Sequence, residues 1–206
     1  MKKIRRLLKI LFSLKWIIYL KNRNTLRNNK VVFHKSLKIG GCLYISNHGT
    51  LNIGENCIIN SGKIYNIIGG DTKTNILIGN GAKLNIGNNV GISNSTFVCR
   101  ELIAINDDVL IGGNCKIYDA DFHSIDFQER MNPYINKTND RFIKKAPIII
   151  NKGAWIGGHC IILKGITIGE MSIIGAGSVL TKSVPPYEIW AGNPARFIRK
   201  IEINEK

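Results

Sequence analysis

The strongest constraint on the fold is a six-residue repeat in the C-terminal half of the chain. Large aliphatic residues recur at every sixth position: Ile150, Ile156, Ile162, Ile168, Ile174 and Leu180. Four positions after each stands a residue that is mostly small or β-branched: Ala154, Cys160, Ile166, Ser172, Ser178 and Val184. A period of six fits neither an α-helix nor a simple alternating strand, but it suits a parallel β-helix whose flat faces take about six residues each. The competing interpretation, buried strands in an ordinary sheet, does not explain so strict a phase. We therefore predict an all-β fold whose aliphatic residues point into a prism.

Glycines directly follow three of these isoleucines, at Gly157, Gly169 and Gly175. We expect them at corners, where a side chain would clash or where φ must be positive. The phase extends upstream to Ile39, less regularly, and it is broken at residues 60–77, which predict a bulged coil or a small surface loop.

The largest interruption is a polar and aromatic stretch at about 118–148. A long loop that leaves a regular solenoid is usually functional or disordered. Because this one carries a histidine among three aspartates, we expect it to be functional.

Residues 1–23 have the spacing of a basic amphipathic helix. Lys15 interrupts the apolar run, which is therefore unlike a signal peptide and too short to span a membrane. Two interpretations stay open for residues 1–22: a helix lying on an anionic membrane face, or a helix packed on the body or on a neighbouring subunit. Trp16, Tyr19 and the flanking cations favour the membrane. Residues 24–38 are expected to form a linker and the first strand.

The chain has 29 Lys and Arg residues against 14 Asp and Glu, a net charge of +15. This balance suggests an anionic partner, but no nucleic-acid-binding motif is present, so nucleic acid is not expected. The five cysteines form no CxxC pair, and Cys57, Cys115 and Cys160 occupy the small inward position of the repeat. They are predicted to be buried reduced thiols of a cytosolic protein. The four histidines do not group as a zinc site would require, so no metal is expected.

Four motifs accompany the repeat, in the order DADFHSID, AWIGGHCIILKGITIG, IGAGSVLTKSVP and AGNPAR. Together they resemble the left-handed β-helix acyltransferases over roughly residues 39–200. Within this family, the chain most resembles the maltose and galactoside O-acetyltransferases and their relatives in polysaccharide biosynthesis. The resemblance implies a left-handed parallel β-helix at 39–184, an active-site loop at 118–148 and a C-terminal CoA-contacting tail at 185–206. It also implies a homotrimer with acetyl-CoA in a groove between neighbouring prisms.

The resemblance assigns His123 as the general base. An imidazole titrates near neutrality, so it can take the proton of an attacking hydroxyl and return it to the CoA thiolate. A carboxylate could orient the ring, and the sequence leaves three candidates open: Asp119, Asp121 and Asp126.

Gly158 matches the family position whose backbone N–H contacts the acetyl carbonyl, where a preformed donor stabilises the oxyanion. Asn114 matches an asparagine that contacts the acceptor sugar, although a plain corner residue is an equal alternative. The acetyl-CoA groove is implied at seven positions: Trp155, Gly157, Ala176, Thr181, Lys182, Arg196 and Arg199. The two arginines match basic residues near the CoA phosphates, which a guanidinium can bind in a bidentate manner. His159 is expected to point outward at the groove and has no assigned role.

The sequence therefore predicts an acetyl-CoA-dependent O-acetyltransferase that acts on a sugar hydroxyl by direct transfer in a ternary complex, in surface polysaccharide biosynthesis. The expected location is the cytoplasm, at the inner membrane face if the N-terminal helix binds lipid. One alternative is an N-acetyltransferase of a nucleotide-linked amino sugar. Another is a non-catalytic β-helix that serves as an assembly subunit.

Overall fold

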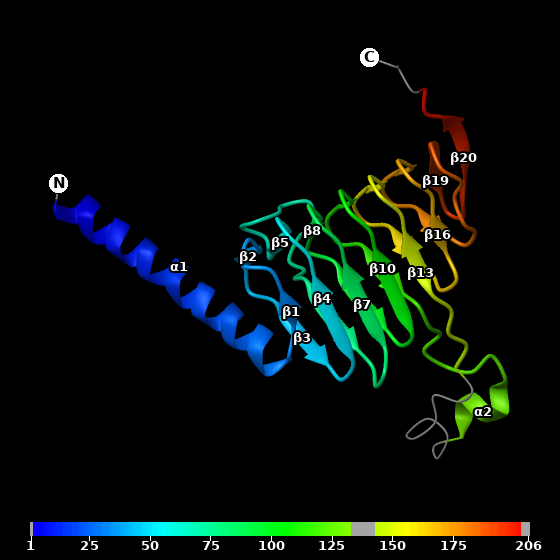
Figure 1. Ribbon diagram of the computed structural model, residues 1–206, viewed down its shortest axis with the longest axis horizontal. Coiled ribbons are helices and arrows are strands. Elements are labelled where there is room, and N and C mark those ends of the chain that lie inside the picture. Colours follow the sequence, from blue (N-terminus) through cyan, green and yellow to red (C-terminus); the bar gives the residue numbers. More distant parts are fainter. Residues whose placement is uncertain (1, 133–142, 203–206) are drawn as a thin grey trace.

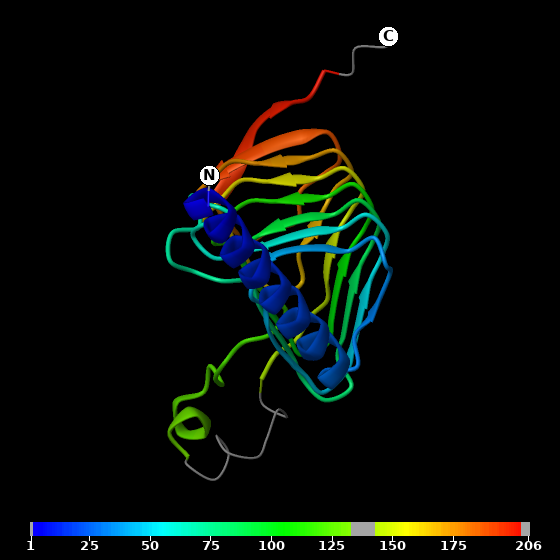
Figure 2. The same ribbon diagram turned by 90° about the vertical axis from the view of Figure 1, so that its left-hand side faces the viewer.

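The computed structural model describes residues 2–132 and 143–202 of the chain. In this part the chain forms a three-sided prism of parallel strands, with one long helix at its N-terminal end and a β-hairpin at its C-terminal end (Figure 1). The view along the prism shows successive coils stacked upon one another (Figure 2). Three parallel sheets of this kind are typical of a left-handed β-helix, so the predicted fold class is confirmed.

Each coil contributes one strand to each of three sheets. The first sheet contains β1 (Val32–Phe33), β4 (Thr50–Ile53), β7 (Lys83–Ile86), β10 (Leu102–Ile105), β13 (Ile148–Ile150) and β16 (Thr167–Ile168). The second contains β2 (Lys38–Gly41), β5 (Ile58–Ser61), β8 (Gly91–Ser93), β11 (Leu110–Ile111), β14 (Trp155–Ile156), β17 (Ile173–Ile174), β19 (Glu188–Gly192) and β20 (Ala195–Lys200). The third contains β3 (Tyr44–Asn47), β6 (Asn75–Ile78), β9 (Thr96–Cys99), β12 (Lys116–Tyr118), β15 (Ile161–Ile162) and β18 (Val179–Leu180).

The six-residue repeat fills the interior of the prism. The six aliphatic residues from Ile150 to Leu180 that define the phase are all fully buried, and the residues four positions later are buried as well. Residues eighteen positions apart stack in register, as Ile150 does on Ile168 and Ile162 on Leu180. Each buried isoleucine contributes about 1.5–3 kcal/mol of transfer free energy, which makes this column the main stabilising feature of the C-terminal coils.

The corner glycines are required by close approach of neighbouring coils. A Cβ built on Gly157 would lie 2.6 Å from the backbone nitrogen of Ala176, and one built on Gly169 would clash with the nitrogen of Pro186. Neither glycine has a positive φ. Of the two reasons expected from the sequence, the steric one holds at these corners.

The N-terminal helix α1 spans Lys2–Asn28, so it continues five residues past the predicted boundary at residue 23. The linker expected to start at residue 24 begins only after Asn28. Tertiary contacts extend the helix: Leu26 is buried, and the Asn22 side chain donates to Gly41 O at 2.7 Å and accepts from Leu43 N at 3.2 Å. Among the described residues, no helix is long and apolar enough to cross a membrane.

Two insertions interrupt the coils at opposite edges of the third sheet. The first, residues 62–74, connects β5 to β6 and therefore leaves the corner between the second and third sheets. The second connects β12 to β13 at the corner between the third and first sheets, and we call residues 119–147 the histidine loop. This loop carries the short helix α2 (Phe127–Met131) and projects from the prism (Figures 1 and 2). The part of the predicted loop at 133–142 lies outside the described residues.

The C-terminal segment closes the second sheet. Strand β19 adds to β17 in parallel, beyond the two prolines, and β20 then pairs with β19 in antiparallel fashion. The AGNPAR motif forms the end of β19, the turn and the start of β20 in this hairpin. Residues 203–206 of the predicted tail lie outside the described residues.

Candidate active site

The predicted site residues lie in two groups at the two edges of the third sheet. At the corner with the second sheet, called the near edge below, lie Asn114, Gly157, Gly158 and Ala176. At the corner with the first sheet, called the far edge, lie Asp119, Asp121, His123, Asp126, Thr181 and Lys182. The remaining residues belong to the second sheet: Trp155 on β14, and Arg196 and Arg199 on β20. Within one chain, the third sheet thus separates the general-base candidate from the oxyanion-donor candidate.

The near edge offers a free backbone donor at Gly158. Its carbonyl accepts from Gly177 N at 2.9 Å, and the next residue, His159, donates its N–H to Gly113 O at 2.8 Å. The Gly158 N–H itself has no acceptor within the described residues. An unpaired and partly buried N–H can bind the oxygen of an acyl group as negative charge develops on it.

A polar cluster surrounds this donor. Lys116 Nζ donates to Asn114 Oδ1 at 2.8 Å, and Asn114 Nδ2 lies 3.2 Å from His159 Nδ1. The other ring nitrogen, Nε2, lies 3.0 Å from Ile68 O. Because a carbonyl can only accept, we assign the proton to Nε2 and let Nδ1 accept from the Asn114 amide. Burial lowers the pKa of Lys116. The Asn114 side chain, expected to bind the acceptor sugar, is thus engaged at both ends.

The far edge presents His123 to solvent, and no carboxylate is bonded to it within the described residues. Asp119 is fully buried and accepts from Arg100 N at 2.6 Å and from Glu101 N at 2.8 Å.

The other two candidate carboxylates also have partners of their own. Asp121 Oδ1 accepts from Lys164 Nζ at 2.5 Å, and Asp126 caps α2 by accepting from Glu129 N at 2.9 Å. In one chain, therefore, none of the three candidates orients the imidazole.

The residues expected to line the CoA groove are accessible. Trp155 is 53% exposed on the outer face of β14, in register with Leu110 and Ile173. Arg196 and Arg199 are exposed on β20, and each donates one Nη1 hydrogen bond to a carbonyl of its own strand. A guanidinium has five N–H donors, so both arginines retain donors for a phosphate.

Four of the five cysteines lie in the core of the prism, and Cys42 is partly buried. Cys57, Cys115 and Cys160 are fully buried, as predicted, and so is Cys99. Burial, reinforced by the neighbouring Asp119 carboxylate, raises the pKa of Cys99 to about 12. A thiol with so high a pKa carries almost no thiolate at neutral pH and is a poor nucleophile. Within the described ranges, no group of three His, Cys, Asp or Glu side chains could hold a metal ion.

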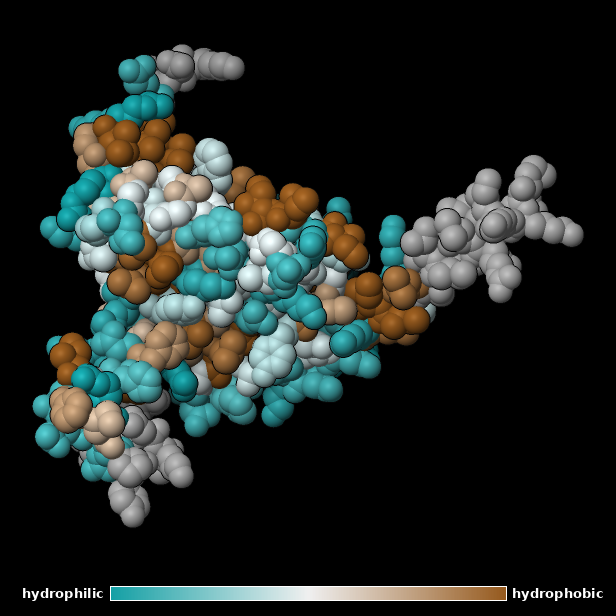
Figure 3. Space-filling view, turned by 180° about the vertical axis from the view of Figure 1, so that it is seen from behind, coloured by the Kyte–Doolittle hydropathy of each residue, from teal (hydrophilic) through white to brown (hydrophobic). Residues whose placement is uncertain are grey.

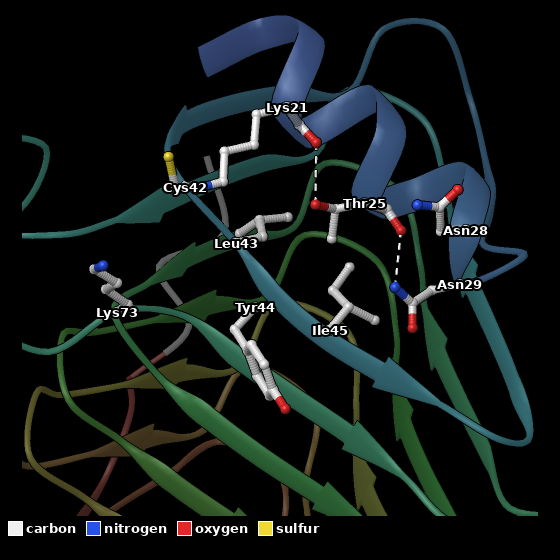
Figure 4. A pocket seen from close by; sticks show the side chains of 9 residues that line it. All are labelled: Lys21, Thr25, Asn28, Asn29, Cys42, Leu43, Tyr44, Ile45 and Lys73. Atoms are coloured by element: carbon white, nitrogen blue, oxygen red, sulfur yellow. Dashed lines mark hydrogen bonds between the residues drawn. The ribbon is translucent and has the colours of Figure 1, made fainter. Parts of the chain in front are cut away.

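A separate pocket of about 370 Å³ lies where α1 meets the prism. It is lined by Lys21, Thr25, Asn28, Asn29, Cys42, Leu43, Tyr44, Ile45 and Lys73, as Figure 4 shows. Hydrogen bonds from Thr25 Oγ1 to Lys21 O (3.0 Å) and from Asn29 Nδ2 to Thr25 O (2.9 Å) hold its helical wall. None of the predicted site residues lines this pocket, so it is distinct from the two edges described above.

The sequence had given no role to His159 or to the insertion at residues 62–74, yet both belong to the near edge. Two signals pointed to them: the break in the repeat phase at residues 60–77, and a histidine directly after Gly158. Neither signal reveals that Ile68 and His159 meet, because 91 positions separate them in the chain.

Stacked parallel sheets with a six-residue repeat define this chain as a β-helix protein of the hexapeptide-repeat class. Solved structures agree. A maltose O-acetyltransferase from Clostridium difficile matches with a TM-score of 0.57 and 28% identity, over 92% of this chain and 84% of that one. A hexapeptide-repeat acetyltransferase from Vibrio cholerae, solved with acetyl coenzyme A, gives a TM-score of 0.55 at 25% identity, over 87% and 75% of the two chains.

Among curated proteins, the galactoside O-acetyltransferase of Escherichia coli is 36% identical over 127 residues, which are 61% of this chain and 58% of that protein. The chain spans between 32% and 58% of the length of the curated relatives it matches. No family model matches it. In sequence and fold the chain is therefore similar to hexapeptide-repeat acetyltransferases, among them galactoside and maltose O-acetyltransferases.

Proposed function

We propose that this protein transfers an acetyl group from acetyl-CoA to a hydroxyl group of a sugar. The observation that carries the proposal is the unpaired Gly158 N–H, which lies in the AWIGGHC motif beside the exposed Trp155. The relatives named for galactoside and maltose O-acetylation support the acceptor class, and the Vibrio cholerae structure supports acetyl-CoA as the donor.

The proposed reaction is a direct attack. The hydroxyl oxygen of the sugar attacks the carbonyl carbon of the thioester, and His123 takes the hydroxyl proton in the same step. The Gly158 N–H binds the oxyanion of the tetrahedral intermediate. The C–S bond then breaks, and the imidazolium returns its proton to the departing CoA thiolate. Arg196 and Arg199 bind the CoA phosphates, Trp155, Gly157 and Ala176 flank the pantetheine, and Thr181 and Lys182 complete the groove.

This reaction requires more than one copy of the chain. His123 and Gly158 lie at opposite edges of the third sheet, and a flat-sided prism can pack against copies of itself around a threefold axis. We infer a homotrimer in which His123 of one protomer meets the near edge of its partner. The partner also supplies the surroundings that orient His123, since none of the three candidate carboxylates does so within one chain.

We further infer that the acceptor is a membrane-associated glycan intermediate of surface polysaccharide synthesis. The outer part of α1 projects beyond the prism and exposes apolar side chains, visible as the brown patch beside the large grey group at the right of Figure 3. Trp16 is 55% and Ile17 58% exposed, and Lys15 and Lys21 lie among them. An amphipathic helix with aromatic residues and cations suits an anionic membrane face.

The test of the catalytic proposal is acetyl-CoA turnover with a panel of sugars, for wild type and His123→Ala. Loss of the general base is expected to lower kcat by about 10²–10⁴. His48→Ala is the matched control, because His48 is an exposed histidine at a distant coil and should leave the rate unchanged. Equal rates for wild type and His123→Ala would remove His123 from the mechanism.

N-acetylation is the second candidate, since the same base and CoA groove would serve an amine. Product analysis separates the two reactions, because an ester is cleaved by mild alkali and an amide is not. A chain that binds no acetyl-CoA at all would instead support the non-catalytic assembly subunit.

A further inference from the structure

The insertion at residues 62–74 folds back over the near edge instead of extending into solvent. Its first anchor is Asn94, a fully buried residue with φ of 45°. Asn94 Oδ1 accepts from Gly62 N at 2.6 Å, and Asn94 Nδ2 donates to Asn66 O at 2.8 Å. Thr72 Oγ1 lies 3.2 Å from Asn94 O. The buried Asn94 side chain therefore holds the beginning and the middle of the insertion, and the backbone carbonyl of the same residue holds its end.

The second anchor is His159, whose Nε2 donates to Ile68 O. Asn94, Asn114 and His159 occupy the same corner in three consecutive coils, and all three have left-handed backbone conformations, with φ of 45°, 61° and 62°. Asn114 holds the His159 ring from the other side. The insertion thus lies across three successive coils and is bonded to two of them.

This placement puts the Ile68 side chain directly beside the Cα of Gly158. A Cβ built on Gly158 would lie 3.1 Å from Ile68 Cγ2. Ile68 is nevertheless 61% exposed, so it is not a core residue, and Ile67 beside it is 79% exposed. A similar approach occurs one coil earlier, where a Cβ on Gly113 would lie 2.6 Å from Gly69 N. The insertion therefore forms a wall immediately beside the free Gly158 donor.

We propose that Ile68 is the wall of the acyl subsite and limits the transferred group to one of acetyl size. His159 is the positioning residue that holds this wall in place through the Ile68 carbonyl. The inference rests on the proposed function. A carbonyl oxygen bound to the Gly158 N–H lies about 2.7–3.2 Å from that nitrogen. The carbon chain beyond the carbonyl then meets the Ile68 side chain within the first few carbons.

The experiment compares acetyl-, propionyl-, butyryl- and hexanoyl-CoA as donors for wild type and Ile68→Ala. One methylene in an apolar pocket changes kcat/KM by about 10–200-fold. The butyryl-to-acetyl ratio of kcat/KM should therefore rise at least about tenfold in Ile68→Ala. Ile67→Ala is the matched control, because the same side chain is shortened on the adjacent residue, and its ratio should equal that of wild type. Calorimetric binding of each acyl-CoA provides a readout that needs no acceptor.

His159 is tested by two substitutions. His159→Ala should relax the chain-length preference in the same direction as Ile68→Ala, because it releases the wall. His159→Gln keeps a donor that can reach the Ile68 carbonyl, and it should restore most of the wild-type ratio. A merely stabilising role for His159 would lower the melting temperature without changing the ratio.

The outcomes separate this inference from the proposed function. An Ile68→Ala variant that is folded, binds acetyl-CoA and keeps the wild-type chain-length ratio would overturn the inference alone. A wild-type protein that binds no acyl-CoA would overturn the proposed function together with the inference. A shift in the ratio with Ile68→Ala and not with Ile67→Ala supports both.

Discussion

At the scale of single residues, the carboxylates of the DADFHSID motif show how similar side chains take different roles. The motif places three aspartates around His123, and each was a candidate to orient the ring. The structure gives each another partner: two backbone amides for Asp119, the Lys164 ammonium for Asp121 and the first turn of α2 for Asp126. Asp119 is the most constrained of them, because its carboxylate is fully buried.

Replacing Asp119 with alanine is expected to destabilise the fold. The substitution leaves two buried backbone N–H groups without an acceptor and removes a charge-assisted interaction, at a cost of about 2–4 kcal/mol. For a chain of this length the melting temperature should fall by roughly 5–15 °C in a calorimetric scan. Asp71→Ala is the control, since Asp71 is 89% exposed in its ion pair with Lys63 and such pairs contribute little. A melting temperature unchanged in Asp119→Ala would contradict the structural role.

At the scale of elements, α1 divides into two parts with different surroundings. Its C-terminal part is bound to the prism through Asn22 and Leu26. Further out, Trp16 stacks on Tyr19 with ring centroids 5.3 Å apart, and both rings remain exposed. The pocket lined by Lys21 and Lys73 lies between the C-terminal part of α1 and strand β3 of the third sheet. Cations beside an exposed apolar helix are the arrangement that we expect at a lipid surface.

Vesicle binding tests this role of α1. The protein should partition into vesicles that contain phosphatidylglycerol, more weakly into phosphatidylcholine alone, and less at high salt, because the attraction between cations and anionic lipid is screened. Trp16→Ser combined with Ile17→Ser removes apolar area and should lower partitioning by at least about tenfold. Ile58→Ser, at an exposed apolar position on the prism, is the control. Undiminished partitioning of the double variant would show that the exposed apolar face of α1 does not carry the membrane contact.

At the scale of the whole molecule, the third sheet lies between the two halves of the proposed active site. Strand β12 (Lys116–Tyr118) begins directly after the near-edge cluster and ends directly before the histidine loop. One prism therefore carries one half of the site at each edge of a flat face. Copies arranged around a threefold axis would bring unlike halves together, which is why we infer a trimer.

Complementation tests this arrangement. We propose that Asn114, together with the Lys116 and His159 side chains bonded to it, binds the acceptor sugar at the near edge. His123→Ala, which lacks the base, and Asn114→Ala, which disrupts this cluster, should then each form a trimer of the 23.0 kDa chain with little activity. In randomly mixed trimers, about a quarter of the sites would combine an intact His123 with an intact near edge, so co-expression should recover about a quarter of the wild-type rate. Sedimentation as a monomer, or no recovery on mixing, would place the whole site within one chain.

The fold was predictable from the sequence because the repeat is a local property. A six-residue period places Ile150, Ile156 and Ile162 inside the prism whatever the rest of the chain does, and the structure buries all three. The position of the histidine loop was predictable for the same reason, since a break in the phase marks where the chain leaves the coil. The motifs then indicated which chemistry to look for at His123 and Gly158.

Other features depend on which coils stack, and only the tertiary structure decided them. His159 bonds to Asn114 across 45 positions and to Ile68 across 91, and the partners of Asp119 come from a neighbouring coil. The end of α1 was likewise moved to Asn28 by contacts of Asn22 and Leu26 with the prism. A residue type and its spacing determine whether a side chain faces inward or outward. The hydrogen-bond partner of an outward side chain is set by the neighbouring coil and by the insertion folded over it, neither of which is encoded nearby in the chain.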